Sequence, residues 1–124
     1  MTYQYNRGLS FEQAIQLLKN AYAAFNSRDI DTVLKYMHTT VQWPNGWEGG
    51  YVQGHDAVRD YWQRQWAAIN PHVEPLAFNE LPDGRVAVQV HQVVKDLAGN
   101  ELLNATIQHI YTIETGLVQT MEIV

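Results

Sequence analysis

One histidine offers the clearest case for chemistry in this chain. His109 lies in the segment 102–113, where the odd-numbered positions are the more apolar set. An imidazole on the apolar face of a strand is costly to bury without a polar partner, and burial favours its neutral form. We therefore predict that His109 lines a pocket as a hydrogen-bond donor or general acid/base. The alternative is a core histidine satisfied by a nearby hydroxyl or backbone group.

A second candidate for proton transfer is a glutamate between glycines, Glu48 in the stretch Gly46-Trp47-Glu48-Gly49-Gly50. Glycines allow unusual backbone angles and the close approach of a ligand. We predict that Glu48 lies at the mouth of the same pocket and acts as a base. The alternative is a loop glutamate that is simply solvated.

Aromatic side chains provide the material for a ligand-binding wall. Indole and phenol rings combine large apolar surfaces with polar edges, which suits a flat or cyclic hydrophobic ligand. Tyr22 could anchor a ligand oxygen, and Tyr111 shares the odd-numbered face of His109. The alternative for the aromatic residues is plain core packing at helical spacing. The predicted ligand-binding set is Tyr22, Trp43, Trp47, Trp62 and Tyr111.

Metal and cofactor chemistry have little support in the sequence. The five histidines show no close ligand spacing, and Asp56 and Asp60 fit a solvated helix face. The chain has no cysteine, and Gly49-Gly50 is not followed by the Gly-Lys-Ser/Thr of a phosphate loop. We therefore expect no metal and no cofactor.

Three helices are predicted to position these residues. Ser10 and Gln13 form a capping box before an apolar stripe that spans 11–26. Asp29 caps a short second helix, whose buried face comprises Ile30, Val33, Leu34 and Met37. The helical period returns from His55 to Ile69, where Asn70-Pro71 ends it.

The remaining segments have the period of strands. A short strand at 40–43 precedes a loop that reaches Gly54, and longer strands are predicted near 73–81, 85–96, 102–113 and 117–124. Val88 and His109 share one sheet face only if the numbers of paired residues sum to an odd value, such as 197 or 199, which a turn of two or four residues achieves. His91 then points to the opposite face. Helices followed by an antiparallel meander predict an α+β fold with one sheet face against the helices.

Length and composition restrict the class of protein. The 124 residues predict a single domain, 1–124, and 46% hydrophobic with 17% charged residues predict a folded chain. A net charge of −5 without a basic stripe argues against nucleic acid as a partner.

No apolar run is long enough to cross a bilayer, so no membrane association and a cytoplasmic location are expected. Residues 1–9 are polar and aperiodic, and a flexible N-terminal arm is predicted there, either ordered on contact with the rest of the chain or frayed.

Four segments, in this order, resemble the nuclear transport factor 2-like superfamily, which includes ketosteroid isomerase and the SnoaL-like polyketide cyclases. They are YAAFNSRDI at 22–30, VQWP at 41–44, GHDAV at 54–58 and HIYTIETGLV at 109–118. The resemblance covers about residues 10–124. It implies a cystatin-like cone, in which three N-terminal helices pack on a curved, mainly antiparallel sheet around a pocket. It also implies a homodimer through the outer sheet face.

The resemblance further places the catalytic positions of ketosteroid isomerase on this chain. The aspartate base falls on Trp43, which has no acid–base capacity, the second aspartate falls near His109, and the tyrosine falls near Ala21 or Tyr22. We therefore expect a SnoaL-like protein that binds a hydrophobic cyclic molecule and acts on it as a cofactor-free acid–base enzyme of isomerase, cyclase or hydratase type. The alternative is a non-catalytic ligand-binding or dimeric interaction module.

Overall fold

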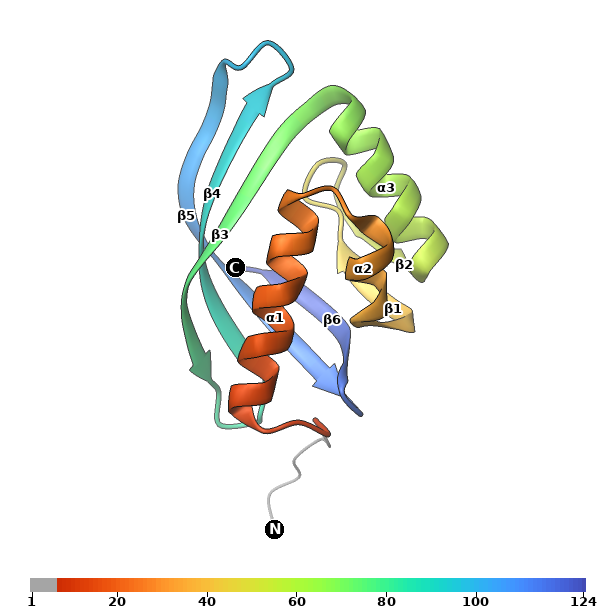
Figure 1. The fold of residues 1–124 in the computed structure, drawn as a ribbon, viewed down its shortest axis with the longest axis vertical. Helices are drawn as coiled ribbons and strands as arrows, with labels where there is room; N and C mark the ends of the chain where they lie inside the picture. Colours follow the sequence, from red (N-terminus) through yellow and green to blue (C-terminus); the bar gives the residue numbers. More distant parts are fainter. Residues whose placement is uncertain (1–6) are drawn as a thin grey trace.

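The structure, a computed structural model, describes residues 7–124 and consists of three helices and one six-stranded sheet (Figure 1). The elements in chain order are α1 (Phe11–Asn26), α2 (Ile30–Lys35), β1 (Met37–Pro44), β2 (Tyr51–Gln53), α3 (His55–Ala68), β3 (Ile69–Glu80), β4 (Val86–Asp96), β5 (Glu101–Glu114) and β6 (Leu117–Ile123). The α+β fold class predicted from the sequence is confirmed.

The helices begin where their capping residues predict. Ser10 accepts the backbone N–H of Gln13, whose side chain in turn accepts the N–H of Ser10, and this capping box starts α1. Asp29 accepts the N–H of Thr32 and starts α2. The prediction that Met37 belongs to this second helix is wrong, because α2 ends at Lys35 and Met37 opens β1, where it is still buried.

The first hairpin of the sheet is longer than its sequence pattern predicts. β1 runs through Pro44, and the segment expected to be loop contains β2, which pairs antiparallel with β1. Pro44 is tolerated because it lies at the end of the strand, where a missing N–H does not interrupt the ladder. The loop prediction therefore holds only for 45–50, at the tip of this hairpin.

The long strands confirm the predicted register. Val88 pairs with His109, Val86 with Tyr111, and a turn of four residues, 97–100, joins β4 to β5. His109 therefore lies on the inner face, while the side chain of His91 bonds Asn104 on the other face. The start of β3 differs from the prediction, because the chain is already extended from Ile69 and Pro71 pairs within the sheet.

The sheet has the order β2-β1-β6-β5-β4-β3, with a parallel pairing only between β1 and β6. Figure 1 shows all three helices on one side of this sheet, with β3, β4 and β5 bending around α1. A cluster of buried side chains lies between the layers. This arrangement fits the sheet-and-helix layers expected from the sequence.

The described residues of the arm predicted at 1–9 contact the body of the fold. Arg7 bonds Glu80 at 2.6 Å and the carbonyl of Gly84 at 2.9 Å, and its own carbonyl accepts the N–H of Gly116. Leu9 packs against the core. This short segment therefore ties the β3–β4 turn to the β5–β6 turn. The rest of the predicted arm, 1–6, lies outside the described residues.

Between residues 7 and 124, no helix combines the length and the apolar character that crossing a membrane requires.

Candidate active site

A cavity of about 590 Å³ lies between the sheet and the helices. Its size falls in the range of small-molecule sites. His109 and Tyr111 of β5 lie in its wall with Tyr22 of α1, and Leu103 and Ile107 continue the β5 wall. All seven residues proposed from the sequence except Glu48 line this cavity.

A chain of three polar groups lies in the wall of the cavity. The hydroxyl of Tyr111 donates to the hydroxyl oxygen of Tyr22 at 2.8 Å, and the Tyr22 oxygen lies 2.7 Å from His109 Nδ1. All three side chains are buried; His109 is 6% exposed. The ring of Tyr22 is nearly parallel to the imidazole, and Tyr111 meets both edge-on. The sequence predicted these residues separately, and the structure joins them.

The hydrogen-bond pattern assigns the tautomer of His109. Tyr22 accepts from Tyr111, so its single proton is free to go to His109 Nδ1, which then accepts. The proton of a neutral imidazole therefore resides on Nε2. In the part of the chain that the structure describes, no group bonds Nε2. Nε2–H is thus a donor without a partner on a side chain that lines the cavity.

Burial controls the charge state of this network. It lowers the pKa of His109 from 6.5 to about 4, so the imidazole is neutral near pH 7. Burial also raises the pKa of Tyr22, with a further contribution from neighbouring Tyr111, and it raises the pKa of Tyr111. Both phenols therefore stay protonated. The three groups together form an uncharged, hydrogen-bonded unit.

The lowered pKa of His109 predicts a pH dependence of stability. An unfolded chain would protonate His109 near pH 6.5, whereas the folded chain resists protonation until about pH 4. The unfolded state therefore binds more protons between these values, and the free energy of unfolding falls as the pH drops through this window. The loss amounts to up to about 3 kcal/mol.

Urea denaturation between pH 4 and 7.5, with His109→Phe as the comparison, measures this effect. The wild-type chain should lose stability in the window relative to the variant, because the variant has no imidazole to protonate. Parallel curves for the two proteins would contradict the assignment of a buried, neutral His109.

Indole rings form another part of the cavity wall, and Trp43 lies beside the polar chain, with its ring 6.3 Å from that of Tyr111. Trp62 of α3 is 1% exposed and meets Trp43 edge-on at 5.6 Å and Phe25 edge-on at 5.3 Å. Trp66 stacks on Trp62 at 5.8 Å but does not line the cavity. Trp43 and Trp62 therefore serve both core packing and the cavity wall, which combines the two interpretations drawn from the sequence.

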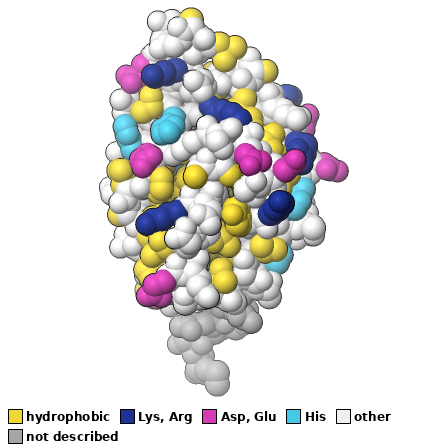
Figure 2. Space-filling model, in the orientation of Figure 1, with side chains coloured by type: hydrophobic (Ala, Val, Ile, Leu, Met, Phe, Trp, Pro, Cys, Tyr) yellow, Lys and Arg dark blue, Asp and Glu magenta, His cyan; other side chains and the backbone are white. Residues whose placement is uncertain are grey.

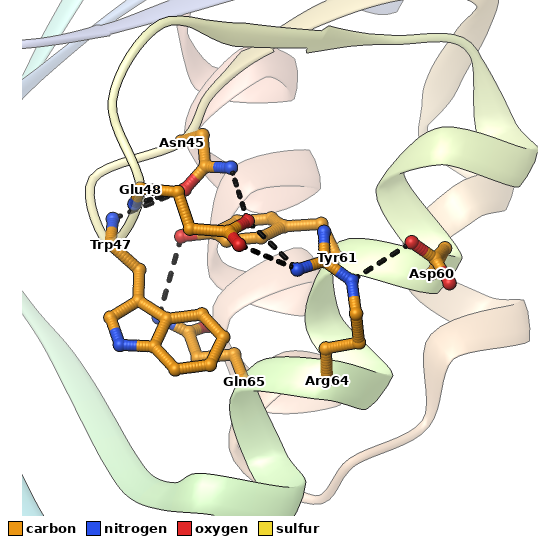
Figure 3. Close-up of polar contacts among 7 residues, drawn as sticks. All are labelled: Asn45, Trp47, Glu48, Asp60, Tyr61, Arg64 and Gln65. Carbon is orange, nitrogen blue, oxygen red and sulfur yellow. Dashed lines mark hydrogen bonds and ion pairs between the residues drawn. The ribbon is translucent and has the colours of Figure 1, made fainter.

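The mouth of the cavity is built by the loop 45–50. Gly46, Trp47 and Gly50 line it, and Trp47 is 44% exposed. Asn45 holds the loop, because its side-chain oxygen accepts the backbone N–H groups of Trp47 and Glu48 (Figure 3). Exposed indole surface at the mouth suits the passage of an apolar ligand.

Glu48 lies on the outer side of this loop and not in the cavity lining. Its carboxylate accepts two bonds from Arg64, both at 2.8 Å, and one from Asn45 at 2.9 Å, while Arg64 also bonds Asp60 (Figure 3). The hydrogen bonds from Asn45 and Arg64 lower the pKa of Glu48. A carboxylate held in this way is a weaker base than the sequence interpretation assumed.

Sequence reasoning missed several polar residues of the cavity. Asn45 lies in a predicted loop and Tyr61 and Gln65 lie in a predicted helix, whereas the other three lie in strands or at a helix end, without any motif. The polar lining residues that the sequence did not single out as ligand-binding are Tyr36, Asn45, Tyr51, Tyr61, Gln65 and Gln92. Tyr61 is the most enclosed of these phenols, since Gln65 donates to its oxygen and burial raises its pKa. The alternation of β4 could have identified Gln92, because it occupies an inward position among valines.

The lining is notable for its lack of charge. Among residues 7–124, no aspartate, glutamate, lysine or arginine side chain lines the cavity. Charged side chains lie instead on the surface, where Figure 2 shows Lys and Arg scattered singly over one face. Nor do the described residues contain three His, Asp or Glu side chains grouped to hold a metal ion. The cavity therefore suits a neutral ligand with few polar atoms.

Comparison with solved structures places the fold among nuclear transport factor 2-like proteins. A structure of an NTF2-like protein from Burkholderia pseudomallei is 24% identical with a TM-score of 0.79, over 94% of this chain and 91% of that one. TerC, co-crystallised with polyporic acid, is 28% identical with a TM-score of 0.79, over 90% of each chain. A putative polyketide cyclase from Xanthomonas campestris is 20% identical with a TM-score of 0.75, over 91% and 90%.

The family model of the SnoaL-like domain matches residues 18–121, so the chain belongs to the SnoaL-like family. No curated protein gives a significant match. The resemblance drawn from the four sequence segments is therefore confirmed.

Proposed function

We propose that this SnoaL-like chain binds a neutral, hydrophobic cyclic molecule and catalyses a cofactor-free acid–base reaction on it, of isomerase, cyclase or hydratase type. The observation that carries the proposal is the Tyr111–Tyr22–His109 chain, which leaves one imidazole N–H without a partner in the wall of an uncharged cavity. Polar groups in an apolar pocket act strongly on a ligand because the local dielectric constant is low.

In the proposed mechanism, His109 Nε2–H donates a hydrogen bond to a carbonyl oxygen of the substrate. Negative charge that develops on this oxygen during enolisation strengthens the bond, and such donors lower a barrier most in a dry site. Tyr22 and Tyr111 position the ring. Their raised pKa values mean that neither phenol gives up its proton, so the imidazole acts as a hydrogen-bond donor and not as the first member of a proton relay.

The absence of a charged base among the described lining residues restricts the substrate. A carbon acid must be acidic enough to lose its proton to water, to its own oxygen or to Glu48 at the rim. Cyclic ketones with an aryl or second carbonyl group beside the C–H bond meet this condition. The named ligands of similar structures support the cyclic character of the ligand and not its lack of charge, because both carry acidic groups. TerC was crystallised with polyporic acid. RV0760c of Mycobacterium tuberculosis, 16% identical over 90% of this chain and 92% of that one with a TM-score of 0.76, was crystallised with estradiol-17β-hemisuccinate.

Deuterium uptake tests the proposal with 2-tetralone, a neutral cyclic ketone with an acidified C–H bond. The wild-type chain should accelerate exchange at that carbon in deuterated buffer, measured by proton NMR, relative to buffer and to serum albumin. Glu48→Gln should retain the acceleration if water or the substrate accepts the proton, and a large loss would instead identify Glu48 as the base. If 2-tetralone binds the wild-type chain but its C–H bond exchanges no faster than in buffer, the result would contradict catalysis.

A non-catalytic ligand-binding module is the second candidate. It is favoured by Trp43, which stands at the family's base position and offers no acid–base group. In that case 2-tetralone would bind without accelerated exchange.

We also propose a homodimer through the outer sheet face, the arrangement implied by the resemblance. Gln89, Thr106 and Gln108 give this face exposed polar surface, on which a two-fold interface can form. The cytoplasmic location expected from the sequence stays a prediction.

A further inference from the structure

Gln92 is a polar residue in an apolar part of the cavity wall. It lies on the inner face of β4, pairs with Val73 of β3 and Ala105 of β5, and is flanked along its own strand by Val90 and Val94. It lines the same cavity as His109. Its neighbours on the sheet therefore offer no side-chain donor or acceptor to its amide.

The amide of Gln92 has no partner elsewhere either. Within residues 7–124 its side chain forms no hydrogen bond, although the side chain is partly buried. A primary amide offers two donors and two acceptor positions. Among the inward positions of β4, which are otherwise valine, a polar amide side chain has no packing advantage over another valine. A ligand atom at the cavity wall would supply the missing partner.

The register of the sheet fixes the separation of Gln92 from His109. His109 of β5 pairs with Val88 of β4. Gln92 follows Val88 by four residues on β4 and points to the same face of the sheet. At about 3.3 Å per residue, the two side chains project from points about 13 Å apart. Ile107 lines the cavity between them. The wall thus presents a donor, an apolar stretch and an amide in a row.

We propose that Gln92 forms a second anchor, so that the ligand is an elongated, neutral molecule of two or more rings with an oxygen at each end. One oxygen accepts from His109 Nε2–H, and the other bonds the amide of Gln92. With bonds of about 3 Å at each end, the two oxygens are separated by about 7 to 13 Å. This inference rests on the proposed function, since it concerns the ligand of the same cavity.

Two matched probes test this anchor: 4,4′-dihydroxybiphenyl, with an oxygen at each end, and 4-hydroxybiphenyl, with one. Equilibrium dialysis gives the affinity of each for the wild-type chain. The diol should bind about 5- to 25-fold more tightly, which combines one additional hydrogen bond with the twofold statistical advantage of its symmetry. This comparison needs no variant, so it does not depend on how a substitution affects folding.

Gln92→Met then removes the amide and keeps the length of the side chain. The preference for the diol should fall to about the statistical twofold, while the affinity for 4-hydroxybiphenyl changes little. Gln89→Met is the matched control, because Gln89 is an exposed glutamine of the same strand on the outer face. It should keep the wild-type preference.

The outcomes separate this inference from the function on which it rests. A wild-type preference no greater than twofold, or a preference unchanged in Gln92→Met, overturns the second anchor and leaves ligand binding at His109 intact. If neither biphenyl binds the wild-type chain, the second anchor and the proposed ligand class are both overturned.

Discussion

Replacing His109 with phenylalanine is expected to reduce the accelerated exchange of 2-tetralone by at least about 100-fold, to a rate close to that in buffer. Removal of a single preorganised donor from an oxyanion site typically costs about 100- to 1,000-fold. A loss of this size is expected because Nε2–H is the donor that the Tyr22 bond to Nδ1 orients.

The phenylalanine variant should remain folded. The ring fills a similar volume, and the surroundings of His109 include Ile107 and Val88, which tolerate an apolar neighbour. The substitution leaves Tyr22 and Tyr111 bonded to each other, so each hydroxyl keeps one hydrogen bond, and only the Tyr22 O–H loses its acceptor. Circular dichroism and the urea midpoint check this point. The variant is thus a test of chemistry and not of folding.

Tyr22→Phe distinguishes the positioning role from the donor role. It removes the bond to Nδ1 and keeps the imidazole in the cavity wall, so the ring can adopt either tautomer. The exchange rate should fall less than in His109→Phe, by about 10-fold, as is typical when the group that orients a functional imidazole is lost. Full wild-type exchange in His109→Phe, with a normal fold, would contradict the mechanism whatever Tyr22→Phe does.

Truncating Trp62 to alanine should produce the largest loss of stability. Its indole is 1% exposed and contacts Phe25, Trp43 and Trp66 at ring separations of 5.3 to 5.8 Å. Replacement of a buried tryptophan or phenylalanine by alanine costs about 3 to 5 kcal/mol, because transfer energy is lost and the space does not close fully. That is a large share of the 5 to 15 kcal/mol that stabilises a typical domain.

Urea denaturation of Trp62→Ala should show a much lower midpoint, with a similar dependence on denaturant concentration. Trp47→Ala is the matched control: it removes the same side chain from the same cavity, but at the exposed mouth. Its cost should be under about 1 kcal/mol, as for most surface substitutions. Equal losses in the two variants would mean that α3 does not pack against the aromatic cluster as the structure describes.

Much of the framework around the site follows from local patterns. Ser10, Gln13 and Asp29 identify the helix starts because a capping side chain bonds a backbone N–H only a few residues away. The two-residue period of β4 and β5, together with a short turn, places His109 inside and His91 outside. These features depend on residues that are close in sequence. The sequence therefore determines them almost alone.

Other features of the framework needed the whole fold. Met37 belongs to a strand because β1 has a partner in β6, some eighty residues later, and β2 forms because β1 is there to pair with it. Only the part of β1 at 40–43 has a strand pattern of its own. Long-range pairing thus overrode local preference in the first half of the sheet.

The site itself was decided by tertiary structure. The sequence indicated by residue type that His109, Tyr22 and Tyr111 could do chemistry, and that indole and phenol rings could line a pocket. Only the packing of α1 against the bent sheet brings the Tyr22 oxygen to His109 Nδ1, and only that contact selects the tautomer. The pairing of Glu48 with Arg64, sixteen positions apart, likewise depends on how the loop 45–50 meets α3. Periodicity assigns a side chain to a face, whereas a cavity, a bond length and a pKa depend on what lies opposite that face.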